Sequence, residues 1–125
     1  MIDQKAYSIF DEKLNEILQL VEVDKAAMDK EALLFLLNSK EGRWFLMRLL
    51  DRTDVFSNTF RCDAAAAAYC EGRRSVGIDV MTDITSMGVE GLKLKQMAEL
   101  EYAQLIQDAY EMRKKLIEQH ESENN

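Results

Sequence analysis

The side chains best suited to specific chemistry are arginines, and most of them lie in one stretch of the sequence. Six of the seven arginines fall between residues 40 and 77, together with the only tryptophan and both cysteines. Arginine carries a rigid fork of donors that binds carboxylates or phosphates in a fixed geometry. The candidate contact residues of this stretch are therefore five arginines and one acid: Arg43, Arg48, Arg52, Arg73, Arg74 and Glu71.

Two interpretations of these six residues stay open from the sequence. In the first, they form a salt-bridge network that joins the helix carrying Arg73 and Arg74 to the helix that carries Arg43 and Arg52. In the second, they bind a phosphate or the carboxylates of a partner. We predict no catalytic role for them, because the sequence has no nucleophile motif, no paired histidines and no Gly-rich phosphate loop.

The cysteines and the histidine do not predict a disulfide, a metal site or a cofactor. Cys62 and Cys70 are eight residues apart, which is about 12 Å along a helix axis and beyond the reach of a disulfide. Neither has a CxxC partner, and the single His120 lies in a polar tail. We expect two buried free thiols in a reducing compartment.

Composition favours one soluble, mostly helical domain. The 125 residues are 47% hydrophobic and 31% charged, with five glycines and no proline. A formal net charge of −7 disfavours loose binding to nucleic acid or to anionic lipid. No apolar run approaches the roughly 20 residues that cross a bilayer, and the N-terminus carries acids where a signal peptide needs basic residues. We expect the protein to remain in the compartment where it is made.

Hydrophobic spacing predicts an all-α fold, a compact bundle of about five helices. We expect a break at Val23 and Asp24, and helix N-caps at Ser39 and Asp63. A single domain would span residues 1–120, and residues 121–125 would form a disordered tail. The predicted helices cover residues 4–22, 25–38, 40–53, 64–87 and 92–120.

The predicted loop at residues 53–61 is unusually apolar. We expect Phe56 and Phe60 to fold back onto the helices and, with Trp44, to fix the loop in place. In the helix that follows, Gly72 and Gly77 each carry a helix-propensity cost of about 1 kcal/mol relative to alanine. A close helix crossing or a local bend would account for each of them.

The last predicted helix is long for so small a bundle. Its 29 residues would extend about 43 Å at 1.5 Å per residue, and its apolar stripe includes Leu105, Met112 and Leu116. We expect its C-terminal half either to project from the body or to pack on a neighbouring subunit as a coiled coil.

One pattern resembles a known family. Its elements, in order, are Gly42-Arg43, Leu49-Leu50, Val55-Phe56-Ser57 with Phe60, an Ala-rich helix turn, Glu71-Gly72-Arg73-Arg74 and Val76-Gly77. This order is similar to short proteins of tailed bacteriophages, whose type member comes from a Bordetella podophage and is encoded among virion-assembly genes. The resemblance covers residues 40–80. The family has no assigned enzyme activity, and the resemblance implies a phage setting with a structural or assembly role, in the virion or in the host cytoplasm during assembly.

Two functions of different classes follow. The first is a virion-structural or assembly protein that binds copies of itself or other phage structural proteins through its helices. The second is a soluble phage regulatory binder, either a packaging accessory that touches DNA through the arginines or an acidic inhibitor of a host protein. The net negative charge makes nucleic acid the less favoured partner, although clustered arginines are compatible with it. No membrane partner is expected.

Overall fold

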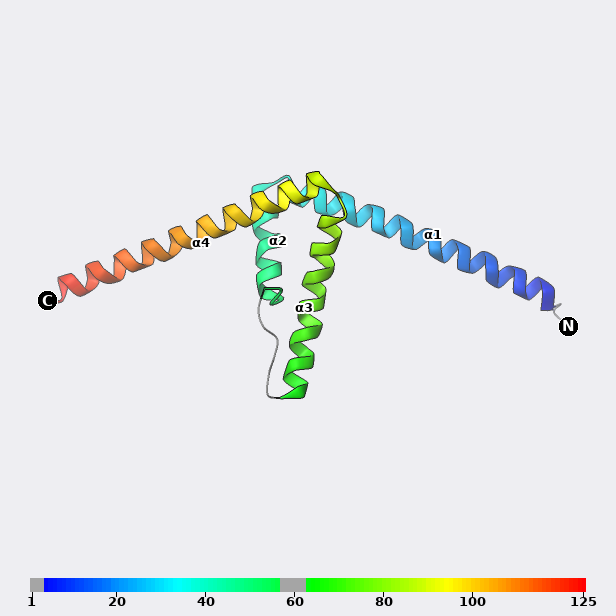
Figure 1. Ribbon diagram of the computed structural model, residues 1–125, viewed down its shortest axis with the longest axis horizontal. Helices are drawn as coiled ribbons and strands as arrows, with labels where there is room; N and C mark the ends of the chain where they lie inside the picture. The colour runs from blue at the N-terminus through cyan, green and yellow to red at the C-terminus, as the bar shows by residue number, and fades with distance from the viewer. Residues whose placement is uncertain (1–3, 57–62) are drawn as a thin grey trace. The chain divides into compact units, whose positions relative to one another are not determined.

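The structure, a computed structural model, describes residues 4–56 and 63–125, and within these residues it contains four α-helices and no strand (Figure 1). Their bounds are α1 Gln4–Leu37, α2 Lys40–Arg52, α3 Ala64–Thr85 and α4 Val89–Glu123. The predicted all-α class is confirmed, but the expected number of about five helices is too high by one.

The difference lies in α1, where the expected break at Val23 and Asp24 is wrong. The helix runs through both residues from Gln4 to Leu37. Valine and aspartate lower helix propensity by less than about 1 kcal/mol each, and residues 4–37 contain neither glycine nor proline. Nothing in the local sequence therefore forces the helix to stop.

The chain divides into two units, residues 1–33 and residues 34–125. The first unit consists of most of α1, and its side chains from Ser8 to Ala32 are all exposed. Several of these exposed side chains are large and apolar: Ile9, Phe10, Leu14, Ile17, Leu18, Leu20, Val21, Val23 and Met28.

The second unit holds the hydrophobic core. Figure 1 shows α2 and α3 beside each other, both meeting the first part of α4, and all three helix pairs are in contact. The core is small, and Val80, Met81 and Tyr102 pack against its edge. The buried apolar side chains of this unit are Leu37, Leu46, Met47, Leu50, Val55, Ile84 and Ala98.

Local signals begin and end the helices of this unit. Ser39 caps α2 by accepting a hydrogen bond from the Gly42 amide, and Asp63 caps α3 by accepting one from the Ala65 amide, as the sequence predicted. Gly88 precedes α4 with φ at +78°, a conformation that glycine adopts without strain. The short turn between α3 and α4 therefore has glycine at the position where the backbone favours it.

The C-terminal part of α4 lies outside this core. Every side chain from Ala103 onward is exposed. The helix continues to Glu123, with Asn124 as its C-cap residue, three residues beyond the predicted helix end at residue 120. Helix-forming glutamate, glutamine and lysine fill this end, and no glycine or proline interrupts it.

Candidate functional site

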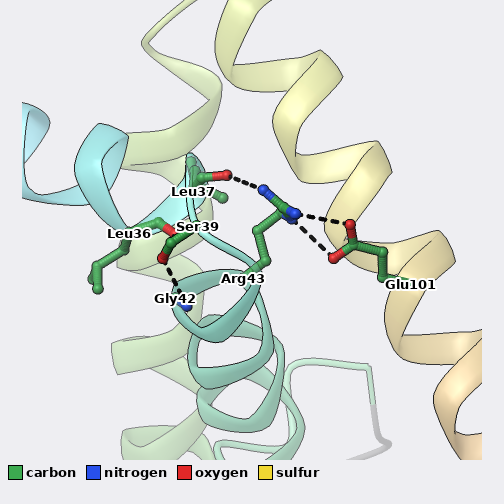
Figure 2. Close-up of polar contacts among 6 residues, drawn as sticks. All are labelled: Leu36, Leu37, Ser39, Gly42, Arg43 and Glu101. Carbon is green, nitrogen blue, oxygen red and sulfur yellow. Dashed lines mark hydrogen bonds and ion pairs between the residues drawn. The ribbon is translucent and has the colours of Figure 1, made fainter.

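Arg43 on α2 joins three segments of the second unit. Its Nε donates to Oε2 of Glu101 on α4 at 2.8 Å, and its Nη2 donates to Oε1 at 2.9 Å. Its Nη1 donates to the carbonyl oxygen of Leu37 at 2.9 Å, at the end of α1 (Figure 2). Because the last carbonyls of a helix have no partner within it, Arg43 both caps α1 and fixes α2 to α4.

Ser39 orders the turn beside this arginine. Its Oγ accepts from the Gly42 amide at 3.0 Å and donates to the Leu36 carbonyl at 3.1 Å. Figure 2 shows Ser39 between Leu36 and Gly42, next to Arg43. The same short segment thus ends α1, begins α2 and sets the position of the guanidinium.

The Arg43–Glu101 pair changes the titration of both groups. The hydrogen bond from Arg43 lowers the pKa of the Glu101 carboxyl below its ordinary value, with the charge of Arg43 adding to it and desolvation opposing it. The same hydrogen bond raises the pKa of the Arg43 guanidinium. The carboxylate is therefore more stable in the folded protein than in the unfolded chain.

We expect this pair to make stability depend on acid pH. Because the folded pKa of Glu101 is depressed, its contribution is complete above the ordinary glutamate pKa and is lost as the pH falls through the lower folded pKa. Urea unfolding at stepwise pH from 6 downward should show wild type losing more stability than Glu101→Gln. Parallel pH curves for the two proteins would contradict the assignment.

A second polar cluster joins α2 to α4. The Tyr102 hydroxyl donates to Oδ2 of Asp51 at 2.6 Å, while Nη1 of Arg48 donates to the Tyr102 oxygen at 3.2 Å and to Asp51 at 3.1 Å. The hydrogen bond to Tyr102 raises the pKa of the Arg48 guanidinium. The Trp44 ring packs against Tyr102 with centroids 5.3 Å apart and planes tilted by 43°.

The third cluster closes the end of α2. The Asp54 amide donates to the Asp51 carbonyl at 3.1 Å, and the Val55 amide donates to the Leu50 carbonyl at 3.3 Å. Asp54 has φ at +57°. Together with the contact of Val55 and Leu50 in the core, this is a Schellman motif with aspartate at its left-handed position.

Two arginines of α3 bind this motif. Arg73 pairs with the Asp54 carboxylate, and that hydrogen bond raises the pKa of the Arg73 guanidinium. Nε of Arg74 donates to the Val55 carbonyl at 3.3 Å. The Arg73 guanidinium also lies over the Tyr69 ring, 5.5 Å from its centroid. The link from α3 thus reaches the residues that follow α2.

The left-handed conformation of Asp54 gives a prediction. Asp54→Gly and Asp54→Ala both remove the carboxylate that binds Arg73, but only alanine keeps a side chain in the left-handed region. We expect Asp54→Ala to be less stable than Asp54→Gly by about 1 kcal/mol, the strain of an L-residue in that region. Urea unfolding of both variants checks this, and equal stability would contradict the role given to the backbone.

The other sequence-predicted residues lie outside these three clusters. Arg52 is exposed on the last turn of α2. Glu71 is exposed on α3, where it takes part in an interaction of its own. Leu105, Met112 and Leu116 are exposed on the outer part of α4.

The expectation for Phe56 is wrong, and Phe60 lies outside the described residues. Phe56 is 65% exposed, whereas its neighbour Val55 is buried. The Schellman motif explains why Val55 rather than Phe56 faces the core, because it turns Val55 onto Leu50. Phe56 instead lines an open groove of about 640 Å³, together with Val55, Arg74, Ile78, Met81 and Thr82.

Three partner residues were not identified from the sequence. Asp54 was considered only for its turn chemistry, Tyr102 was assigned to the apolar stripe of the last helix, and Glu101 was not singled out. Glu101 and Tyr102 could have been identified from the sequence, because they lie about one helical turn after Ala98, on the half of α4 that faces the body. Their pairing with arginines more than fifty residues away has no local pattern.

The arrangement of these side chains is suited to holding helices together. Each arginine of the three clusters donates to a carboxylate, a carbonyl or a hydroxyl of another segment. Residues 4–56 and 63–125 contain no group of three or more His, Cys, Asp or Glu side chains that could hold a metal. In the same part of the chain, no helix combines the length and apolar character needed to span a bilayer.

Comparison with known proteins found one related family. The profile of the family described as Bbp19-like phage protein matches residues 33–107, which includes the three clusters and the core. This range extends the resemblance at residues 40–80 in both directions. Neither the curated proteins nor the solved structures gave a match.

Proposed function

The chain belongs to the family of Bbp19-like phage proteins, and from this membership we propose that it is a non-enzymatic component of the bacteriophage virion or of its assembly. It acts through helix-mediated protein contacts and is present in multiple copies. Its partners are copies of itself or other structural proteins of the particle.

The observation that carries the proposal is the apolar stripe on α4 beyond the core. Leu105, Met112 and Leu116 are all exposed, Met112 to 64%. The family match ends at residue 107, so most of this stripe lies beyond it. Contiguous apolar surface rimmed by polar residues marks protein contact sites. The stripe therefore supports a role in which α4 binds protein.

The arginine contacts weigh against the alternative of a DNA-binding regulator. Arg43, Arg48, Arg73 and Arg74 each donate at least one hydrogen bond to a group within the chain, which holds these side chains in internal contacts. The formal net charge of −7 also opposes attraction to phosphates. Both observations support protein rather than nucleic acid as the partner class.

Mass spectrometry of purified particles and of assembly intermediates tests the proposal. We expect the protein in one of the two, at a level of several copies per particle. Its presence only in intermediates would identify an assembly role, and its presence in mature particles a structural role. Absence from both, with the protein abundant in the infected-cell lysate, would contradict the proposal.

A further inference from the structure

The outer part of α4 carries a regular coiled-coil seam. Leu105, Ala109, Met112 and Leu116 are spaced by four, three and four residues, the alternation of a and d positions in a heptad. All four are exposed. We propose that this seam pairs with the same seam of a second copy, antiparallel, over residues 105–116. The inference rests on the proposed function and names the partner of that surface.

Charges beside the seam complement each other between two copies. Asp108 and Lys115 lie one heptad apart on the same edge of the seam, and both are exposed. In an antiparallel pair, residues on this edge meet the same edge of the partner in reverse order. Asp108 of each copy then faces Lys115 of the other, which gives two attractive pairs.

A parallel pair would have a different electrostatic pattern. It would bring Asp108 near Arg113 of the second copy, but it would also place the basic run 113–115 of the two copies at the same level. Like charges at one level repel. Charge therefore favours the antiparallel pair only modestly, and the position of α2 decides between the two.

In the fold, α2 covers the continuation of this seam. Ala98 and Tyr102 extend the same spacing toward the core, where Ala98 is buried and Tyr102 packs against Trp44 of α2. In a parallel pair, the two α2 helices would occupy the seam at the same level. In an antiparallel pair they lie at opposite ends, and each meets only the polar last residues of the other copy.

The length of the overlap sets the expected strength. Twelve residues extend about 18 Å along a helix, shorter than most stable coiled coils, which use three or more heptads. The pairing should therefore depend on protein concentration. Sedimentation equilibrium or light scattering across a wide concentration range gives its dissociation constant.

Charge exchange in the full chain tests the orientation. At low salt, Asp108→Lys should weaken the dimer by roughly fivefold or more, because two attractive pairs become repulsive. Adding Lys115→Asp should restore dimerisation to near the wild-type constant, whereas adding Arg113→Asp should not. All substitutions are at exposed helix positions, and circular dichroism checks that the helix content is unchanged.

Two results would overturn the inference. Rescue by Arg113→Asp in place of Lys115→Asp would show a parallel pair. A wild-type chain that stays monomeric at all concentrations would show that a different partner covers the seam. Neither result changes whether the protein is found in particles or assembly intermediates. Failure of the antiparallel pairing is therefore distinguishable from failure of the proposed function.

Discussion

Replacing Gly77 by alanine is expected to destabilise the protein by about 3 kcal/mol, the upper end of the cost of overpacking a core. A Cβ atom at this position would lie 2.2 Å from Oγ1 of Thr53 and 2.2 Å from Cγ2 of Val55. Both residues are buried, and the Thr53 hydroxyl is held by the carbonyls of Leu49 and Leu50. Neither can move aside without disturbing the end of α2.

Gly72 supplies the matched control for this substitution. It lies on the same helix, and a Cβ atom there would meet nothing within 4 Å. Gly72→Ala should therefore stabilise the protein by up to about 1 kcal/mol through helix propensity alone. Urea unfolding of both variants measures the two changes in the free energy of unfolding, which should have opposite signs. Destabilisation by both, or by neither, would contradict the close crossing of α3 with the end of α2.

Replacing Arg43 by methionine should destabilise the protein by about 2 kcal/mol. The Arg43 side chain is 13% exposed and that of Glu101 is 33% exposed, so the change leaves a half-buried carboxylate and the Leu37 carbonyl without their donor. Breaking a fully buried pair costs about 3–5 kcal/mol, and partial exposure reduces that figure. Glu101→Gln and the double variant complete a thermodynamic cycle in urea.

Arg52→Met is the control for this cycle. Arg52 is exposed on the same helix, and its replacement should change stability by no more than about 0.5 kcal/mol. The cycle should give a favourable coupling between Arg43 and Glu101. Additive effects of the two single changes would show that Arg43 acts through the Leu37 carbonyl alone.

The helical class and most helix bounds could be predicted because their causes are local. The absence of proline, the hydrophobic spacing and the two capping residues, Ser39 and Asp63, are all visible in the sequence. The expected break at Val23 and Asp24 failed because residues of modest helix propensity do not stop a helix that nothing else interrupts. The end of α4 was set too early for the same reason.

The contacts of the arginines could not be predicted in detail because they depend on which helix faces meet. Residues three apart on a helix are neighbours, so spacing alone is enough to indicate the Arg48–Asp51 pair that the structure contains. Glu101 and Asp54 became partners only through packing of α4 and the turn after α2. Phe56 was misplaced because the turn at the left-handed Asp54 places Val55, and not Phe56, against the core.

The two glycines of α3 show the same limit. The sequence indicates that Gly72 and Gly77 each disfavour the helix, but not which of them is required. Only the packing of α3 on Thr53 and Val55 distinguishes them. Residue type therefore shows that each glycine lowers the helix propensity of α3. The tertiary structure shows that packing requires glycine at Gly77 and does not require it at Gly72.

Complementation of phage production by variants of the α4 stripe measures whether this stripe binds protein during particle assembly. Met112→Lys and Gln107→Lys each add one positive charge at an exposed position of the same helix, but only Met112 belongs to the stripe. We expect Gln107→Lys to support normal particle yield, and Met112→Lys to fold to the same stability but to reduce the yield at least tenfold. Equal yields from the two folded variants would contradict this expectation.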